Sequence, residues 1–191
     1  PRDAVLSPDG KQLALAWNGD IWTVSSGGGL LRQVTTSPAR ESNPKFSPDG
    51  KSFAFISDRS GANQVYRMSL QGGVLQQLTF HTEGCSLEEW CSDGRLLIWG
   101  SRDHFWKRAD RFFFIDNKPR AQERLVFDAY GMAGRVSPDG KTILFQRDGS
   151  RWWRKGYKGS RAGQIWQYSI ASGTFTEQVL EETGSRTPIW H

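Results

Sequence analysis

Ser47-Pro48-Asp49-Gly50-Lys51 is one of three identical pentapeptides in this chain; the others begin at Ser7 and Ser137. A variant copy begins at Cys91, and from Ser7 to Ser47, Cys91 and Ser137 the successive spacings are 40, 44 and 46 residues. This is an internal repeat with insertions of variable length. Proline sets the backbone for the second position of a type I turn, and glycine supplies the left-handed conformation as the chain reverses. Each copy therefore predicts a tight turn between two strands.

Apolar residues flank each copy of the turn with a spacing of two. After Gly50, Phe53 and Phe55 alternate with Ala54, and this period predicts a strand at Ser52–Ser57. The repeats also predict strands at Gln12–Trp17 and Gln64–Ser69, and outer strands at Leu30–Val34, Leu75–Thr79 and Arg124–Asp128. Because Ala54 is apolar as well, we expect the strand at Ser52–Ser57 to be covered on both faces. Repeats of about 40–45 residues cover such faces by stacking on one another. The sequence predicts an all-β fold, a partial β-propeller of four four-stranded blades plus the first strand of a fifth.

The repeat also predicts where the blades begin and end. The stretch Thr187-Pro188-Ile189-Trp190 matches Asn43-Pro44-Lys45-Phe46, which ends a first strand. Four blades and one strand do not close a ring, so we expect a piece of a longer polypeptide, interrupted inside a propeller at both ends. The expected blades are residues 1–40, 41–84, 85–130 and 131–183, with the next blade starting at 184–191.

The composition gives few constraints on the cellular setting. The chain has 191 residues and no run of 18 or more apolar ones, so no membrane span is predicted. It begins with Pro1, and both an exported or periplasmic and a cytoplasmic location stay open. We interpret Cys85 and Cys91 as unpaired thiols, although their spacing leaves pairing open. No metal-ligand spacing accompanies them, and no cofactor is predicted.

One loop is set apart by its length and charge. The turn glycine precedes the third strand by 11 residues in the first repeat (Gly10 to Ile21) and by 25 in the fourth (Gly140 to Ile165). The inserted segment 147–161 has a net charge of +5, which equals the charge of the whole chain. The rest of the chain is therefore neutral. A general polyanion binder spreads its cations along a face, so nucleic acid is not the partner we favour.

Aromatic residues are interleaved with the cations of this loop, which combines stacking surface with guanidinium groups that pair with carboxylates. We predict that the loop holds acidic or C-terminal carboxylate groups of peptides through bidentate pairing. The alternative is a solvated insertion whose tryptophans pack on the neighbouring blade. The candidate substrate-binding residues are Arg147, Arg151, Trp152, Trp153, Arg154, Lys155, Tyr157, Lys158 and Arg161.

The repeated turn, with Ser57-Asp58-Arg59-Ser60-Gly61 and the closing Leu78-Thr79, resembles the propeller repeats of TolB translocation proteins, prolyl-oligopeptidase relatives and tricorn peptidases. The basic stretch 154–160 followed by Gln164-Ile165-Trp166-Gln167-Tyr168 is similar to a loop and strand of tricorn-like peptidases. This resemblance implies a serine peptidase acting on oligopeptides. Its propeller would screen substrate, or channel it to a catalytic region outside this chain.

No catalytic residue is predicted within these residues. His81, His104 and His191 lie in loops or at the chain end, and no nucleophile motif accompanies them. Three functions stay open: a tricorn-like peptidase propeller, a TolB-like protein-binding module with no enzyme attached, and a nucleic-acid-binding propeller. The implied partners are a peptide or protein substrate and the remaining blades and catalytic region of the parent chain.

Overall fold

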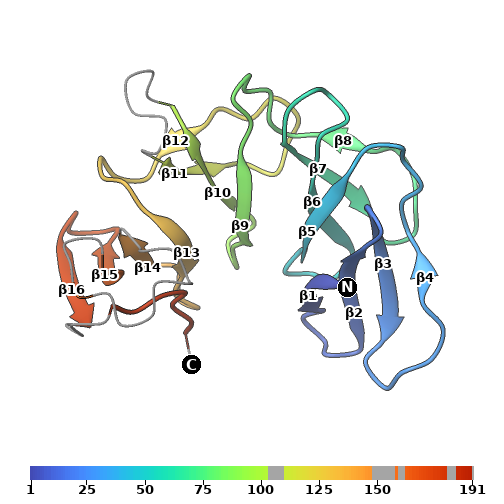
Figure 1. The fold of residues 1–191 in the computed structure, drawn as a ribbon, viewed down its shortest axis with the longest axis horizontal. Helices are drawn as coiled ribbons and strands as arrows, with labels where there is room; N and C mark the ends of the chain where they lie inside the picture. The colour runs from blue at the N-terminus through green and yellow to red at the C-terminus, as the bar shows by residue number, and fades with distance from the viewer. Residues whose placement is uncertain (103–109, 148–157, 159–161, 180–183, 191) are drawn as a thin grey trace. The chain divides into compact units, whose positions relative to one another are not determined.

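The computed structural model describes residues 1–102, 110–147, 158, 162–179 and 184–190. These residues form β-strands and no helix, and the strands make four four-stranded sheets (Figure 1). Accordingly, this part of the chain has no helix that is long and apolar enough to cross a membrane.

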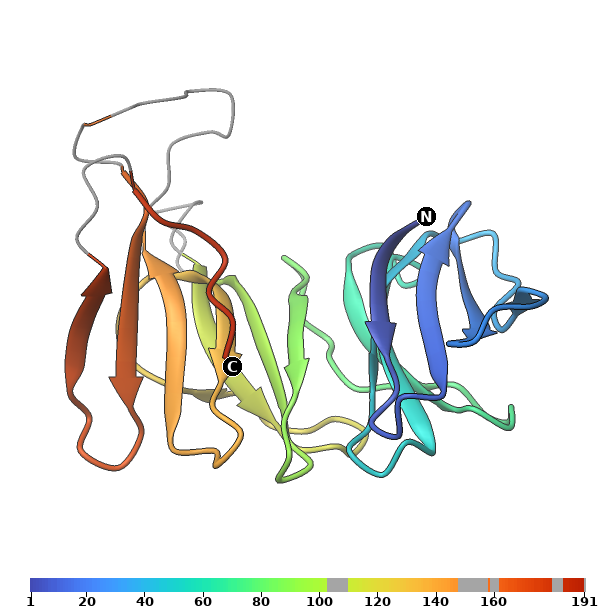
Figure 2. The same ribbon diagram turned by 90° about the horizontal axis from the view of Figure 1, so that it is seen from below.

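The first two sheets have the strand orders β1-β2-β3-β4 and β5-β6-β7-β8, and neighbouring strands are antiparallel (Figure 2). Each sheet is a blade in which sequential strands are neighbours. The eight strands are β1 (Arg2–Leu6), β2 (Gln12–Trp17), β3 (Asp20–Ser25), β4 (Arg32–Gln33), β5 (Glu41–Phe46), β6 (Ser52–Ser57), β7 (Gln64–Ser69) and β8 (Gln76–Gln77).

The third and fourth sheets repeat this order, as β9-β10-β11-β12 and β13-β14-β15-β16. Their strands are β9 (Ser86–Trp90), β10 (Leu96–Ser101), β11 (Asp110–Ile115), β12 (Arg124–Leu125), β13 (Met132–Val136), β14 (Thr142–Arg147), β15 (Gln164–Ser169) and β16 (Phe175–Val179). The predicted fold class, a partial β-propeller of four four-stranded blades plus the start of a fifth, is confirmed.

The repeated pentapeptide forms the predicted turn between the first and second strand of a blade. In the second blade the amide of Gly50 donates to the carbonyl oxygen of Ser47 at 2.8 Å, and Gly50 has a φ of 67°. The Ser47 hydroxyl donates to Asp49 and accepts the amide of Ser52 at 2.9 Å. The same contacts recur in the turns that begin at Ser7 and Ser137. Side-chain hydrogen bonds thus add to the backbone hydrogen bond that closes the turn.

The outermost strands of the first three blades have two residues each, fewer than the sequence suggested. Leu75–Thr79 was expected to form a strand, but β8 has only two residues. The reason lies in Thr79, whose hydroxyl oxygen accepts the amide of Val65 at 2.9 Å. A side chain therefore occupies the place of the next backbone partner. In the same way, the hydroxyl oxygen of Thr35, which follows β4, accepts a hydrogen bond from the amide of Ile21.

The chain divides into two compact units. Unit one comprises residues 1–98 and 115–122, and unit two comprises 99–114 and 123–191. In unit one the buried cluster consists of Ala16, Ile21, Phe53, Phe55 and Tyr66, which come from both of the first two blades. Side chains of neighbouring blades thus share one core.

A backbone hydrogen bond ties each of several first strands to the preceding blade. At the start of β5 the amide of Glu41 donates to the carbonyl oxygen of Gly19 at 2.7 Å, directly before β3. In unit two the amide of Ser185 donates to the carbonyl oxygen of Gly163, directly before β15, at the same distance of 2.7 Å. Residue 185 therefore takes the place at which a new blade begins.

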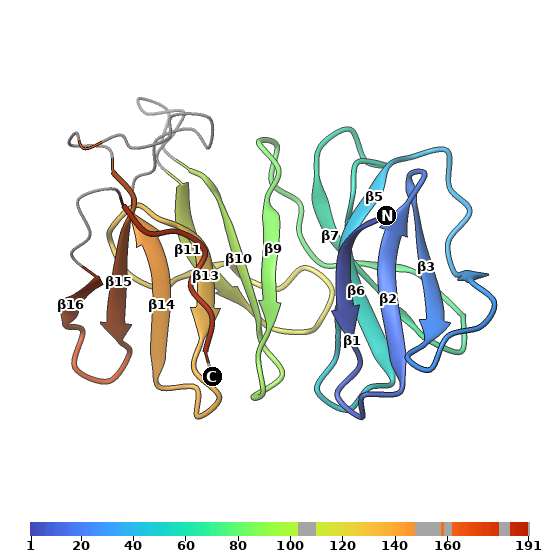
Figure 3. The same cartoon turned by 60° about the horizontal axis from the view of Figure 1, so that its bottom comes forward.

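The backbone that follows supports this assignment. Asn43 and Thr187 occupy equivalent positions and have left-handed φ values of 54° and 51°. The indole nitrogen of Trp190 donates to the carbonyl oxygen of Arg135 at 3.0 Å, so the chain end runs beside β13 (Figure 3). Residues 184–190 thus have the features of the first strand of a fifth blade.

Candidate functional site

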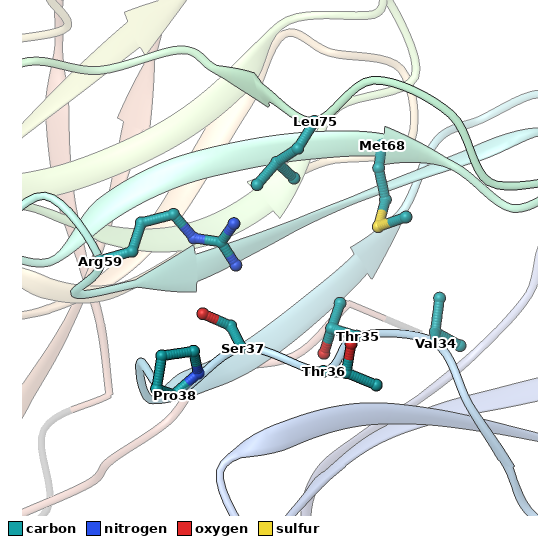
Figure 4. A pocket seen from close by; sticks show the side chains of 8 residues that line it. All are labelled: Val34, Thr35, Thr36, Ser37, Pro38, Arg59, Met68 and Leu75. Atoms are coloured by element: carbon teal, nitrogen blue, oxygen red, sulfur yellow. The ribbon is translucent and has the colours of Figure 1, made fainter.

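A pocket of about 350 Å³ lies in unit one between the first two blades (Figure 4). One side is the segment 34–38, which follows β4. The opposite side comes from the loop after β6, from β7 and from the residue before β8. The lining residues are Val34, Thr35, Thr36, Ser37, Pro38, Arg59, Met68 and Leu75.

Backbone contacts hold the segment 34–38 in place. The amide of Val34 donates to the carbonyl oxygen of Ile21 at 2.9 Å, and the amide of Ser37 donates to a carboxylate oxygen of Asp20 at 3.3 Å. Val34, Met68 and Leu75 pack against the buried core cluster of unit one. The apolar wall of the pocket is therefore continuous with the core of unit one.

Arg59 supplies the cation of the pocket. Its Nε donates to the hydroxyl of Ser57 at 3.0 Å, its Nη2 donates to the carboxylate of Glu41, and the guanidinium carbon lies 5.0 Å from the centre of the Tyr66 ring. Among the residues that the structure describes, Nη1 has no hydrogen-bond partner. Three contacts thus fix the guanidinium and leave one of its nitrogens available to a ligand.

Glu41 is the unusual member of this arrangement, because it is a carboxyl group with 0% of its surface exposed. Its Oε1 pairs with Arg59, whereas its Oε2 has no hydrogen-bond partner in the described part of the chain. Burial raises the pKa of Glu41, and the Thr35 hydroxyl and the Arg59 guanidinium oppose that shift. With Glu41 ionised, the Glu41–Arg59 pair has no net charge.

Most of the loop predicted to bind substrate lies outside the described residues: Arg151, Trp152, Trp153, Arg154, Lys155, Tyr157 and Arg161. Two of its members are described. Arg147, at the end of β14, pairs in register with Gln164, and its guanidinium carbon lies 5.8 Å from the centre of the Trp166 ring. Lys158 is exposed. The carboxylate-binding role of this loop stays a prediction.

The histidine and cysteine side chains that the structure describes lie in ordinary structural environments. Nδ1 of His81 accepts the amide of Glu83 at 3.1 Å, while His104 and His191 lie outside the described residues. Cys85 and Cys91 are buried and form no disulfide with each other, in agreement with the interpretation of the sequence. Burial raises the pKa of Cys91 to about 12. Among the described residues, no group of three or more His, Cys, Asp or Glu side chains could hold a metal ion.

The sequence did not predict the pocket or the buried pair behind it. Arg59 belongs to the motif Ser57-Asp58-Arg59-Ser60-Gly61, which indicates a propeller repeat and not a ligand group. Its partner Glu41 lies 18 positions earlier in the chain. The one signal in the sequence is the charge of Glu41 at the start of a blade. The residues at the equivalent positions of the next two blades, Cys85 and Gly131, are uncharged.

Four consecutive four-stranded sheets, each with its strands in sequential order, define this chain as part of a β-propeller. The family model of the tricorn protease N-terminal beta propeller domain matches residues 2–191, and the chain belongs to this family.

Individual relatives agree with this assignment. Tricorn protease homolog 1 of Streptomyces coelicolor is 29% identical over 168 residues, which cover 83% of this chain and 15% of that protein. The Tol-Pal system protein TolB of Bordetella pertussis is 50% identical over 54 residues, or 28% of this chain and 12% of TolB. The crystal structure of the tricorn protease aligns with a TM-score of 0.75 at 18% identity, covering 95% of this chain and 18% of that chain. The chain thus spans a small part of these relatives and is a propeller of the tricorn and TolB type.

Proposed function

We propose that the chain is a non-catalytic propeller segment of a tricorn-like serine peptidase, which screens peptide substrate or channels it to a catalytic region outside these residues. The observation that carries this proposal is the tricorn family match, which extends over residues 2–191. The relatives that support it include a tricorn protease homolog aligned over 83% of the chain. Peptides would therefore be the natural ligands of both the pocket and the basic loop.

Within this function, the basic loop 147–161 anchors acidic or C-terminal carboxylate groups. Six cations against one acid give it a net charge of +5, and arginine pairs with carboxylates through two parallel hydrogen bonds. The cation–π contact of Arg147 with Trp166 ties the described end of this segment to β15. The anchor would therefore extend from a firmly folded strand.

The test uses the full-length parent protein with Arg151, Arg154 and Lys155 changed together to Ala. Turnover of peptides with a free C-terminal carboxylate should fall, whereas turnover of the matching C-terminal amides should change little. Equal effects on both peptide series would refute the anchor. Binding of a single-stranded oligonucleotide that weakens steeply with salt would instead support a nucleic-acid-binding propeller. A parent protein that hydrolyses no peptide at all would refute the peptidase function itself.

A TolB-like module that binds proteins and has no enzyme attached is the second candidate. It is favoured by the 50% identity with TolB over 54 residues, which is higher than the identity with the tricorn homolog. The parent open reading frame separates the two candidates. A peptidase would contain further blades, a PDZ-like region and a serine-containing catalytic region, whereas a TolB-like protein would contain no catalytic region.

A further inference from the structure

The pocket in unit one places a hydrogen-bond donor beside an apolar wall. Nη1 of Arg59 has no hydrogen-bond partner in the described residues, and Arg59 lines the pocket. Arg59, Met68 and Leu75 face the segment 34–38 across the pocket (Figure 4). Mostly apolar pockets with a few fixed polar groups are the usual small-ligand sites of proteins, because the apolar part gives affinity and the polar part gives orientation.

The charge of Glu41 determines which kind of ligand group can best accept a hydrogen bond from Arg59. The carboxylate of Glu41 contacts the guanidinium of Arg59 and has no exposed surface, so it neutralises the cation at close range. A ligand carboxylate would bring a second negative charge near Glu41 and would lose its hydration on entry. A neutral carbonyl oxygen accepts the same hydrogen bond without that repulsion. The pocket therefore favours an uncharged acceptor.

Size limits the occupant further. At about 350 Å³ the pocket is near the lower end of the range of about 300–1,000 Å³ that is typical of ligand sites. It can hold a short stretch of an extended chain, with one apolar side chain against Met68 and Leu75. Thr36 and Ser37 line the opposite wall and carry hydroxyl groups that can form hydrogen bonds with a peptide backbone.

We propose that this pocket binds an internal, uncharged segment of an extended peptide, in which one backbone carbonyl accepts a hydrogen bond from Arg59 and the adjoining apolar side chain packs on Met68 and Leu75. The proposal rests on the proposed peptide-handling function and specifies the kind of substrate segment that is retained. It differs from the role proposed for the loop 147–161, which concerns carboxylate groups.

The test again uses the full-length parent protein, labelled with ¹³C at the methionine methyl groups. Met68 lines the pocket, so its methyl signal reports occupancy directly. The change Met68→Leu identifies that signal, and Met132 in unit two provides an internal reference. The probes are N-acetyl-leucine amide and N-acetyl-leucine, which differ in the charge at one end. At pH 7 the amide should shift the Met68 signal at about tenfold lower concentration than the carboxylate.

Three variants and one control make the result specific. Thr36→Trp fills the pocket from an exposed position and should abolish the Met68 shift, whereas Gln71→Trp, exposed in the same unit and outside the pocket lining, should retain it. Arg59→Lys keeps the charge but loses the fork of donors, and it should weaken amide binding by about tenfold, as expected for one lost charge-assisted hydrogen bond. Glu41→Gln removes the balancing charge and should turn the preference toward the carboxylate probe.

Several outcomes would overturn the proposal. One is the absence of a Met68 shift with the amide, and another is an equal shift in Thr36→Trp. Tighter binding of the carboxylate by the unmodified protein would refute the neutral-acceptor argument, as would an unchanged preference in Glu41→Gln. Peptide hydrolysis by the parent protein is measured separately. If hydrolysis is present and Met68 does not respond, the pocket proposal fails while the peptidase function stands.

Discussion

The guanidinium of Arg59 donates a hydrogen bond to the carboxylate of Glu41, a side chain with 0% exposed surface. Glu41 begins β5, the first strand of the second blade, and Arg59 lies in the loop between β6 and β7 of the same blade. The pair thus fastens a loop at one end of the blade to its first strand. It also sets the charge beside the pocket that Arg59 lines.

Removing Arg59 should therefore destabilise unit one far more than a surface change does. In Arg59→Ala the buried carboxylate of Glu41 loses its partner, and breaking a buried ion pair from one side costs about 3–5 kcal/mol. Hydrogen exchange of the amides of β5 to β7 in the full-length protein measures this cost as a local opening free energy.

The matched control removes the charge that would be left unpaired. Adding Glu41→Gln to Arg59→Ala should recover most of the loss, because the buried group then carries no charge. If the double variant is as unstable as Arg59→Ala alone, the cost comes from lost packing over Tyr66 and not from the orphaned carboxylate.

The repeated turns should make stability sensitive to acid. The Ser47 and Ser137 hydroxyls lower the pKa of Asp49 and Asp139. A carboxyl group with a lowered pKa in the folded state stabilises the fold above its unfolded pKa, about 3.9, and loses that contribution as the pH falls through the folded value. The thermal midpoint should thus fall with pH below about 4, and less steeply in the double variant Ser47→Ala, Ser137→Ala.

Two comparisons make this pH dependence specific. Ser25→Ala removes an exposed hydroxyl that accepts the amide of Gly27, and it should leave the slope unchanged. Glu41 acts with the opposite sign, because burial raises its pKa. Its contribution is greatest below its unfolded pKa and is lost as the pH rises through the folded value. If the thermal midpoint of the double variant fell more steeply at acid pH than that of the unmodified protein, the role given to the serine hydroxyls would be contradicted.

The middle strands of the blades could be predicted from the sequence because their residues lie close together in the chain. The expected strands Gln12–Trp17, Ser52–Ser57 and Gln64–Ser69 are observed with those bounds. Local turn chemistry and period-two burial determine them. The outer strands of the first two blades, β4 and β8, are shorter than expected, since threonine hydroxyls replace backbone partners there, and this depends on tertiary contacts.

The pocket could not be predicted for a related reason. It forms where residues 34–38 meet Arg59, Met68 and Leu75, which belong to the next blade. The sequence shows each of these residues as an ordinary member of a loop or strand. These residues come together only when two blades pack against each other. The charge of Glu41 becomes important for the pocket only because the side chain is buried against Arg59. The loop 147–161, by contrast, was visible in the sequence as a local concentration of charge.

The turn glycines should be required for their backbone conformation. Gly50 has a φ of 67°, and a Cβ there would meet only Pro8, at an ordinary 3.8 Å. Gly50→Val should therefore cost more than about 1 kcal/mol through backbone strain, because β-branched residues strongly disfavour this region. The control is Gly27→Val in the same unit, where φ is not positive. Equal thermal midpoints of the full-length Gly50→Val and unmodified proteins would show that the turn tolerates side chains.

The thiol of Cys91 should be inert while the protein is folded. Its pKa is raised to about 12, chiefly by burial, and thiolate is the reactive form. Iodoacetamide at pH 8 should therefore leave Cys91 unmodified in the folded protein and alkylate it in urea, with mass spectrometry locating the label. Rapid labelling of Cys91 under native conditions would mean that β9 and its turn open readily.

Gly131 should be required for space and not for conformation. It precedes β13 without a left-handed φ, but a Cβ there would lie 2.5 Å from Cδ2 of Phe145 and 2.9 Å from Cε2 of Phe112. These rings pack with Phe127 at centroid distances of 4.8 and 5.7 Å, so they have little room to withdraw. We expect Gly131→Ala to cost about 1–3 kcal/mol, the usual range for an overfilled core.

The decisive comparison for Gly131 is a rescue. Phe145→Leu removes the ring that would collide with the new methyl group, so the cost of Gly131→Ala should be smaller when it is measured in the Phe145→Leu background. Gly140→Ala is the matched control, because a Cβ there meets nothing within 4 Å and its φ is 71°. Its cost, about 1 kcal/mol of backbone strain, should be the same in both backgrounds. If Gly131→Ala is equally costly with and without the Phe145 ring, steric overlap with that ring is not what excludes a side chain at position 131.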